Sequence, residues 1–301
     1  MAGQSAAGPR PTILLTGAGG QLGRELAAAL PAHGHVIACD RARLDLAQPE
    51  AIARVVQETA PAIIVNAAAY TAVDRAEAEP ARAFAINARA PGLLAEAALR
   101  AGALLIHFST DYVFDGTRRE PYDEAARTSP CNVYGASKLE GERAIAASGA
   151  AALTFRTSWV YTRHGQNFLV TMQRLAATRD ELRVVADQTG VPNWGRALAR
   201  AIAALVARGP TYLAERAGLY HLSAAGETTW YDFARAILGD RVRIVPITTA
   251  DYPTPAKRPA YAVLDASRFA RTFGFALPDW KTLLHACLAE PAEPAPAIAV
   301  R

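Results

Sequence analysis

Short apolar runs rich in β-branched residues alternate with longer helical patterns through the first half of the chain. The apolar runs lie at residues 11–16, 35–40, 62–66, 103–109 and 151–156, and helical patterns occupy residues 21–30, 48–59 and 80–100. Nearly continuous apolarity is typical of strands covered on both faces. The pattern therefore predicts an α/β fold with a parallel, doubly wound sheet, and we expect ligands at the carboxyl ends of its strands.

Three breaks in this pattern indicate boundaries. Pro91 interrupts a helical stretch and predicts a kink or a break between two helices. After residue 160 the chain becomes less regular and rich in Pro, Trp and Tyr. We therefore expect a first domain over residues 11–160 and a smaller α/β lobe, mainly for binding a substrate, over residues 161–288. The ends, residues 1–10 and 289–301, are expected to be disordered tails.

Composition excludes several classes of protein. No apolar run approaches the ~20 residues that span a bilayer, and the first ten residues lack the apolar middle of a secretory signal. We expect a cytoplasmic protein that does not bind membranes. The net charge is only +4, with Lys and Arg scattered among Asp and Glu, so nucleic acid is not an expected partner. The three cysteines are widely spaced and indicate buried thiols rather than disulfides or a zinc site.

A glycine-rich turn at residues 16–23 follows the first predicted strand and opens the first helix. Glycine lets the backbone turn tightly and approach a diphosphate, and the free N–H groups at a helix start can receive its charge. The turn therefore predicts a dinucleotide site of the Rossmann type at Gly17, Gly20 and Gly23.

Asp40 ends the second predicted strand, about twenty residues after the turn, where an acidic residue can hold a ribose hydroxyl of NAD. Arg41 and Arg43 follow it, and a guanidinium there can equally bind the 2′-phosphate of NADP. Both NADPH and NADH therefore stay open. Later loops add candidates for contact with the cofactor, namely Asp45, Leu46, Ala69, Tyr70 and Thr71.

The run from Tyr134 to Lys138 carries the clearest chemistry. Residues four apart share one face of a helix, so the ammonium of Lys138 can lie beside the phenol of Tyr134 and the ribose of a dinucleotide. A neighbouring cation favours the phenolate and is expected to bring the pKa of Tyr134 toward neutrality. The spacing alone also fits a tyrosine packed beside a solvated lysine. The glycine turn upstream favours reduction of a carbonyl.

The segment 109–114 ends a buried strand, so its hydroxyl groups are expected at the same edge as the dinucleotide. Thr110 can hydrogen-bond a substrate oxygen, although strand termination alone also explains the segment. His107 lies inside the same apolar run, and we interpret it as a satisfied core residue rather than a catalytic one.

Together these residues resemble the extended short-chain dehydrogenases, and within them the reductases of nucleotide-linked deoxysugars. The likeness covers residues 12–288 and rests on six motifs, at residues 16–23, 64–74, 109–114, 132–138, 155–161 and 228–232. It implies NADPH- or NADH-dependent reduction of the C4 ketone of dTDP-4-dehydro-L-rhamnose to dTDP-L-rhamnose, a precursor for polysaccharides such as lipopolysaccharide O-antigen.

The resemblance also implies roles for single residues. Thr110, Tyr134 and Lys138 form the implied catalytic set. The dinucleotide is expected among Gly20, Gln21, Leu22, Asp40, Asp45, Leu46, Ala69, Tyr70 and Thr71. The substrate is expected to touch Thr110, Asp111 and Trp159, with Asn167 and residues 257–259 near its nucleotide or diphosphate.

Some members of this family bind Mg²⁺ through acidic side chains at a dimer contact. Glu25 fits one such position, but Arg196 stands where a second acid is wanted. Both metal dependence and the choice between monomer and homodimer therefore stay open. Two other functions also stay open: an epimerase or dehydratase that keeps its NAD, and a non-catalytic subunit like the regulatory partner of methionine adenosyltransferase.

Overall fold

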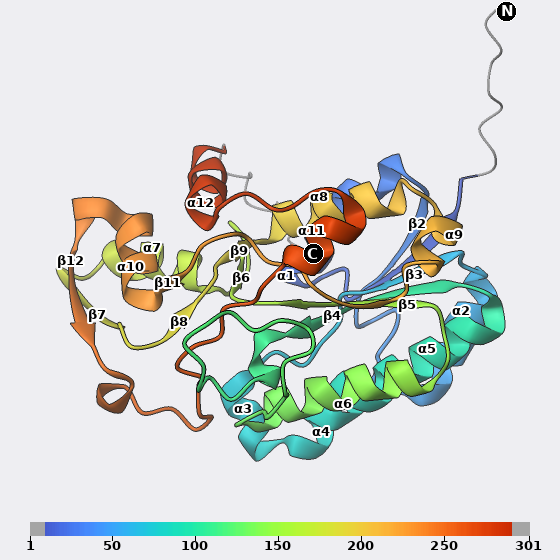
Figure 1. Ribbon diagram of the computed structural model, residues 1–301, viewed down its shortest axis with the longest axis horizontal. Helices are drawn as coiled ribbons and strands as arrows, with labels where there is room; N and C mark the ends of the chain where they lie inside the picture. The colour runs from blue at the N-terminus through green and yellow to red at the C-terminus, as the bar shows by residue number, and fades with distance from the viewer. Residues whose placement is uncertain (1–9, 291–301) are drawn as a thin grey trace, which may run out of the picture.

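A six-stranded parallel sheet forms the centre of the molecule (Figure 1). The computed structural model describes residues 10–290, so most of the two expected tails lies outside the described residues. In spatial order the strands are β10 (Gly218–His221), β5 (Ala152–Thr157), β4 (Leu104–Thr110), β3 (Ile63–Asn66), β1 (Thr12–Thr16) and β2 (His35–Cys39). Chain order reverses between β1 and β3, the switch point where doubly wound sheets bind ligands. The predicted fold class is confirmed.

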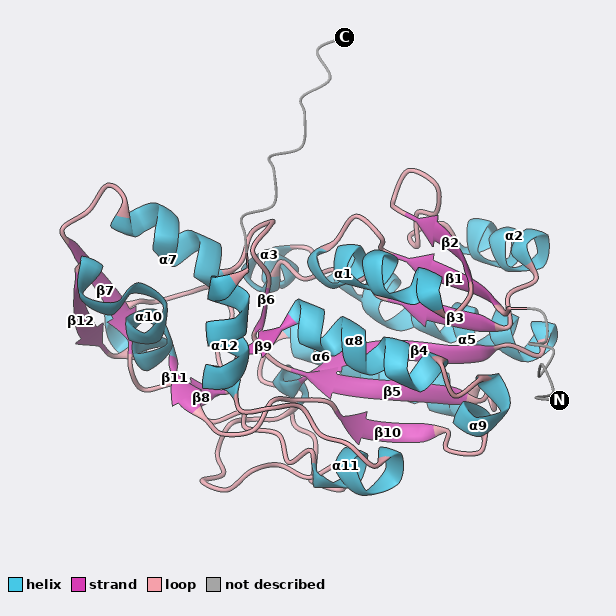
Figure 2. Cartoon of the chain, turned by 90° about the horizontal axis from the view of Figure 1, so that it is seen from above, coloured by secondary structure: helices cyan, strands magenta, loops and turns pink. Residues whose placement is uncertain are grey.

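Helices cover both faces of the sheet (Figure 2). One face carries α1 (Gln21–Ala29), α8 (Gly195–Val206), α9 (Pro210–Ala214) and α11 (Ser267–Phe273), with the 3₁₀ turn Leu30–Ala32 after α1. The other carries α2 (Pro49–Thr59), α5 (Ala90–Ala101) and α6 (Val133–Ala147). Alternate strand residues face each layer, which is why the strands read as continuously apolar.

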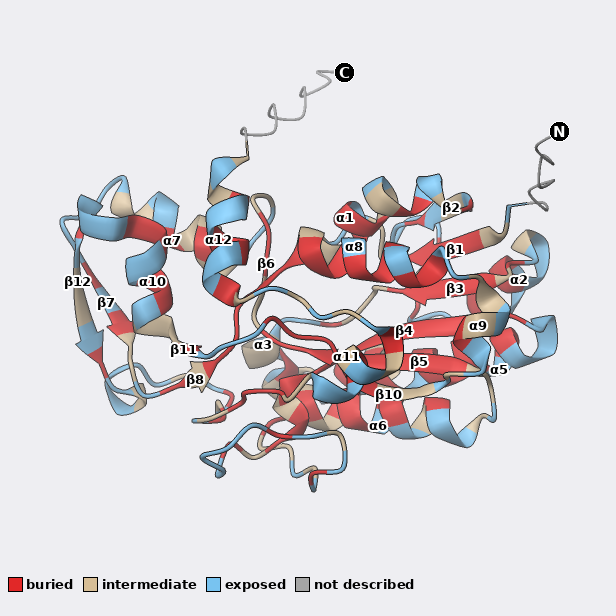
Figure 3. Ribbon diagram, turned by 45° about the horizontal axis from the view of Figure 1, so that its top comes forward, coloured by how far each residue is buried: buried red, intermediate tan, exposed pale blue. Residues whose placement is uncertain are grey.

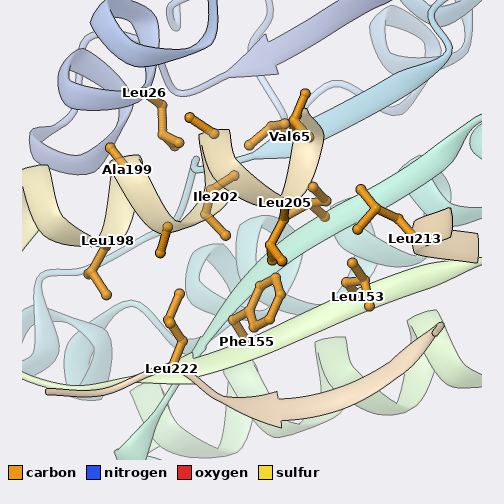
Figure 4. Packing of buried hydrophobic residues seen from close by; sticks show 14 of the residues in the cluster. Leu26, Val65, Leu153, Phe155, Leu198, Ala199, Ile202, Leu205, Leu213 and Leu222 are labelled. Atoms are coloured by element: carbon orange, nitrogen blue, oxygen red, sulfur yellow. The ribbon is translucent and has the colours of Figure 1, made fainter. Parts of the chain in front are cut away.

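The core of the first face lies between α8 and the middle of the sheet (Figure 4). Ile202 and Leu205 on α8 are fully buried, as are Val65 on β3 and Phe155 on β5. Figure 3 shows the same burial along the central strands and the inner sides of the helices. This packing fixes the positions at which the strands end, and therefore the edge where the site lies.

The interruption predicted at Pro91 takes the form of a widened helical turn. A helical run passes through α3 (Val73–Ala78), α4 (Pro80–Phe84) and a π-helical turn (Ala85–Arg89) before α5 begins. Pro91 has no N–H to donate to Asn87, four residues earlier. The Asn87 carbonyl lies against α6 instead, because a Cβ added at Gly141 would come within 2.1 Å of its oxygen.

A smaller unit lies beyond one end of the sheet (Figure 1). It holds β6 (Val160–Tyr161), α7 (Phe168–Ala176), β7 (Glu181–Val185), β8 (Thr189–Gly190), β9 (Asn193–Trp194), β11 (Thr228–Thr229), α10 (Trp230–Leu238), β12 (Arg243–Ile247) and α12 (Trp280–Ala289). Three further 3₁₀ turns are η3 (Asp111–Val113), η4 (Gly239–Arg241) and η5 (Thr249–Asp251). The unit has its own core around Phe233 and Trp280. Because α8, α9, β10 and α11 lie with the large sheet, the chain after residue 160 contributes to both units.

Within residues 10–290, no helix has the length and apolarity needed to cross a membrane.

Candidate active site

The turn between β1 and α1 has close backbone packing that only glycine allows. Gly17 has a φ of +69°, and a Cβ there would lie 2.5 Å from the backbone nitrogen of Ala68. A Cβ at Gly23 would lie 2.0 Å from the Gly17 carbonyl oxygen. Gly20 is the N-cap of α1 and donates its N–H to the same oxygen over 2.9 Å. Because glycine is the N-cap, no side chain covers the backbone N–H groups at the start of this nine-residue helix. The turn therefore forms a cradle that fits the diphosphate of a dinucleotide.

Gln21 and Leu22 begin α1 and have different surroundings. Leu22 packs against the core between α1 and the sheet. The side-chain oxygen of Gln21 accepts a hydrogen bond from Nδ2 of Asn167 over 2.8 Å. Asn167 also caps α7, where its Oδ1 accepts the Val170 N–H over 3.1 Å. Asn167, expected near the substrate, thus joins the smaller unit to the start of α1.

Charged side chains gather at the end of β2. The carboxylate of Asp40 is exposed and accepts the backbone N–H of Arg43 over 3.0 Å. Arg41 is exposed and its Nε lies 3.3 Å from Asp45. A hydrogen bond from the backbone N–H of Ala47 holds the pKa of Asp45 below its usual range, and the Arg41 side chain has a smaller effect in the same direction. The arrangement thus places a carboxylate and guanidinium groups side by side at the end of β2.

The loops expected to border the cofactor are anchored by buried side chains. Leu46 is buried with Leu44 and Ile52, so it fastens its loop to the core. After β3, Ala69 is half-buried and Thr71 exposed, while Tyr70 is buried and donates its hydroxyl to Glu79 over 3.0 Å.

Asn87 is a buried polar residue that sequence reasoning missed. Its Oδ1 accepts the Tyr70 N–H over 2.8 Å. Its Nδ2 donates to the Tyr70 carbonyl and to Ser137 Oγ, each over 3.0 Å. Asn87 therefore joins the loop after β3 to α6, between Tyr134 and Lys138. The available signal was an amide in an apolar helical pattern shortly before Pro91.

Thr110, Asp111 and Tyr134 meet beyond the end of β4. Thr110 donates its hydroxyl to Asp111 Oδ1 over 2.9 Å, and its side chain lies near enough to Tyr134 to affect the pKa of the phenol. Burial raises the pKa of Asp111 to about 7, and its Oδ2 has no partner among the described residues. Burial also raises the pKa of Tyr134 to about 12, an effect that Thr110 opposes. The expected lowering of the Tyr134 pKa is therefore wrong: desolvation outweighs any nearby cation, and the phenol keeps its proton at neutral pH.

Lys138 is buried and points to the strand below α6. Its Nζ donates to the Phe108 carbonyl over 2.5 Å and lies 3.2 Å from Nε2 of His107. Burial lowers the pKa of Lys138 to about 8, and the charge of Glu142 opposes this change. Burial holds the pKa of His107 well below its usual value, and the charge of Lys138 adds a smaller effect in the same direction. His107 is fully buried and satisfied as predicted, but it also touches an expected catalytic residue.

Trp159 follows β5 and lies at the border of the smaller unit. Its indole stacks on Trp230 with ring centroids 3.5 Å apart and planes at 8°. Its φ is +41°, a conformation that is rare for a bulky residue and that concentrates at functional sites. A Cβ at Gly190 would lie 2.6 Å from the indole, so the ring is held on that side as well.

The basic run 257–259 lies next to the start of α6. Arg258 forms an ion pair with Asp74 over 2.8 Å. The Lys257 carbonyl accepts from Asn132, the N-cap of α6, over 2.8 Å. These contacts place the run beside the helix that carries Tyr134.

Glu25 is engaged by cationic and imidazole groups of the same chain. Arg196 Nε donates to one carboxylate oxygen over 2.8 Å, and His164 Nε2 lies 3.1 Å from the other. Arg196 also donates to Glu290 over 2.5 Å. Among residues 10–290, no group of three or more His, Cys, Asp or Glu could hold a metal ion. The described residues of this chain therefore give no support for the Mg²⁺ site that the resemblance implies.

Known proteins match this chain nearly from end to end. The family model described as RmlD substrate binding domain matches residues 11–292. A dTDP-4-dehydrorhamnose reductase from Burkholderia thailandensis is 47% identical over 293 residues, which covers 92% of this chain and 97% of the relative. One from Escherichia coli K12 is 45% identical over 284 residues, covering 89% and 94%.

Solved structures agree. The crystal structure of dTDP-4-dehydrorhamnose reductase from Bacillus anthracis in complex with NADP has a TM-score of 0.88 at 37% identity, and covers 94% of this chain and 100% of that one. An orthologue from Clostridium acetobutylicum has a TM-score of 0.87 at 39% identity, covering 92% and 98%. This chain therefore belongs to the dTDP-4-dehydrorhamnose reductase family.

Proposed function

We propose that this protein reduces the C4 ketone of dTDP-4-dehydro-L-rhamnose to dTDP-L-rhamnose. The observation that supports the proposal is that Thr110 at the end of β4 lies beside Tyr134, and that Lys138 on the same helix binds the Phe108 carbonyl of β4, in a chain that matches reductases of this name over about their whole length. The cradle at the glycine turn, on the same edge of the sheet, supports a nicotinamide dinucleotide as the reductant.

Tyr134 is the proposed proton donor. When bound, the nicotinamide supplies a hydride to the carbonyl carbon, and the carbonyl oxygen then needs a proton. The raised pKa keeps the Tyr134 phenol protonated at neutral pH, which is the form that reduction consumes. Thr110 lies beside that phenol and so can align the same carbonyl oxygen. Lys138, one turn along α6, stabilises the negative charge that remains when the phenol gives up its proton.

The substrate contacts are part of the same proposal. Thr110, Asp111 and Trp159 surround the sugar, with the run 257–259 and Asn167 nearer the nucleotide and cofactor. The smaller unit is proposed to bind mainly the substrate, including its nucleotide. Binding energy from that remote group holds the ketone in place for reaction.

For the cofactor, we propose a modest preference for NADPH. Arg41 and Arg43 beside Asp40 support this choice, as does the Bacillus anthracis relative, whose crystal structure contains NADP. Mg²⁺ forms no part of the proposal.

An absorbance assay tests the proposed reaction. Purified protein mixed with NADPH and dTDP-4-dehydro-L-rhamnose is expected to oxidise one NADPH per substrate over many turnovers. Free 4-keto-6-deoxysugar should react very poorly, because it lacks the nucleotide. Absence of oxidation despite measurable NADPH binding would contradict the proposal and favour a non-catalytic subunit. An epimerase or dehydratase would instead purify with tightly held NAD and convert its substrate without net oxidation.

A further inference from the structure

Three polar side chains form a row across the sheet that ends at Lys138. Thr16 on β1 pairs in register with Asn66 on β3, and Asn66 pairs with His107 on β4. Their strand neighbours Leu14, Ile64 and Leu105 face the α5 and α6 layer. Because residues two apart on a strand share a face, the row faces the same layer. It connects the strand before the glycine turn to a proposed catalytic residue.

Hydrogen bonds within this row fix the direction of each group. Asn66 Oδ1 accepts the Thr16 hydroxyl over 2.6 Å and the Ala68 N–H over 3.2 Å. The backbone N–H can only donate, so the oxygen of Asn66 must face Ala68. Its amide nitrogen therefore faces Nδ1 of His107, 3.0 Å away. Nδ1 must accept this bond, and a neutral imidazole then carries its proton on Nε2.

This tautomer points an N–H group at Lys138. Nε2 of His107 lies 3.2 Å from Nζ of Lys138, and the Phe108 carbonyl takes one N–H of Lys138 over 2.5 Å. An ammonium has three donors and no lone pair, whereas a neutral amine can accept the Nε2 hydrogen. The amine form satisfies every contact in the row, and the ammonium form sets two N–H groups against each other.

Other charges around Lys138 act in different directions. Glu142, one turn further on α6, favours the ammonium, but Arg156 on β5 binds its carboxylate over 2.6 Å and 2.9 Å. On α6, Glu140 and Arg143 are exposed and form an ion pair with each other. Burial raises the pKa of Tyr134 on α6, and of Tyr112 and Asp111 on η3. On the helices packed against α6, Glu77 binds the Val133 N–H, while Arg82, Arg89 and Glu96 are exposed. His107 is thus the ionisable neighbour that contacts Nζ directly, beside the uncharged Phe108 carbonyl.

We propose that His107 is a positioning residue for Lys138: its tautomer, fixed by Asn66, holds Nζ at the end of β4 and disfavours the ammonium form. The kinetic consequence rests on the proposed function, because stabilising the Tyr134 oxygen requires a cation at Lys138. Turnover is then expected to fall as pH rises and Lys138 loses its proton.

Nitrogen NMR tests the tautomer without any reference to activity. The protein has six histidines, so ¹⁵N-histidine labelling gives a small set of ring signals, and His107→Gln assigns the one from His107. We expect a neutral ring protonated on Nε2 across neutral pH. A ring protonated on Nδ1, or an imidazolium, would overturn the proposal even if the protein proves to be an active reductase.

A pH profile tests the effect on Lys138. In His107→Gln, a side-chain carbonyl can accept from the ammonium, so the alkaline limb of kcat/KM should move up by about one pH unit. Thr154→Val is the matched control, because Thr154 is the next residue in register and valine keeps its shape. The limb should not move in this control. An unmoved limb in folded His107→Gln would contradict the proposal, and if that variant does not fold, the NMR result on the native protein decides.

Discussion

Tyr134 and Lys138 lie one helical turn apart, and burial moves their proton affinities in opposite directions. Burial disfavours whichever form is charged, so the pKa of Tyr134 rises to about 12 and that of Lys138 falls to about 8. The i, i+4 spacing was enough to predict that the two residues share a helix face. It could not reveal the desolvation, because that depends on what β4 and η3 place around them.

The phenol of Tyr134 is expected to be essential for turnover. Tyr134→Phe keeps the ring and its edge-to-face contact with Tyr112, but removes the proton donor. We expect kcat to fall by at least ~10²-fold, as is typical when a general acid is lost, with little change in the Kd for NADPH. Initial rates and a binding titration check the two quantities. Near-native turnover would mean that water or another group protonates the ketone.

At neutral pH, the buried ammonium of Lys138 is expected to lower the stability of the fold. Its folded pKa lies below its unfolded value of about 10.5, so its contribution to stability is present above that pH and is lost as pH falls through about 8. At pH 7 we therefore expect the free energy of unfolding of Lys138→Met to exceed that of the native protein by on the order of 1 kcal/mol. Denaturant titrations at pH 7 and pH 10.5 measure the difference, which should shrink at the higher pH. A variant less stable than the native protein at pH 7 would contradict this expectation.

Arg41 is expected to set part of the cofactor preference. Its side chain is exposed beside Asp40 and is positioned by Asp45, so it can meet a 2′-phosphate. Arg41→Ala should bring the ratio of kcat/KM for NADPH to that for NADH toward one. Arg54→Ala, which removes an exposed arginine paired with Glu58 on α2, is the matched control and should leave the ratio unchanged. An unchanged ratio in Arg41→Ala would show that other groups read the phosphate.

At the scale of elements, the strands were the most predictable part of the chain. Five of the six central strands follow from continuous apolar runs, because a strand buried on both faces leaves that signature. The sixth, β10, is four residues long and contains a glycine, a tyrosine and a histidine, so local pattern does not separate it from a loop. The glycine turn was predicted from its spacing, whereas the contacts of Asn87 required knowledge of which helices pack together.

The start of α1 provides a test at this scale. A Cβ at Gly23 would lie 2.0 Å from a backbone oxygen, so Gly23→Ala should lower the free energy of unfolding by ~1–3 kcal/mol and weaken NADPH binding. Gly19→Ala is the control in the same turn, since its Cβ would come no closer than 3.8 Å to Asp40. Thermal unfolding should separate the two variants. Equal stability would mean that the turn relaxes more easily than its packing indicates.

At the scale of the whole molecule, the two units share the later half of the chain. A division at residue 160 follows from the change in composition, but α8 packs on α1 and β10 lies beside β5. Such pairings join residues far apart in sequence and leave no periodic signal. Trp159 and Asn167 lie where the chain passes between the units, and their contacts with Trp230 and Gln21 could not be read from local pattern.

Hydride transfer from the nicotinamide to C4 of the sugar is the step on which the proposed function depends. It can be followed with NADPH carrying deuterium at both C4 positions of the nicotinamide, dTDP-4-dehydro-L-rhamnose as substrate, and mass spectrometry and NMR of the nucleotide sugar. We expect dTDP-L-rhamnose with one deuterium, located on C4, for each NADPH oxidised. Product without deuterium, or unchanged ketone despite bound NADPH, would contradict the assignment of this chain as the reductase.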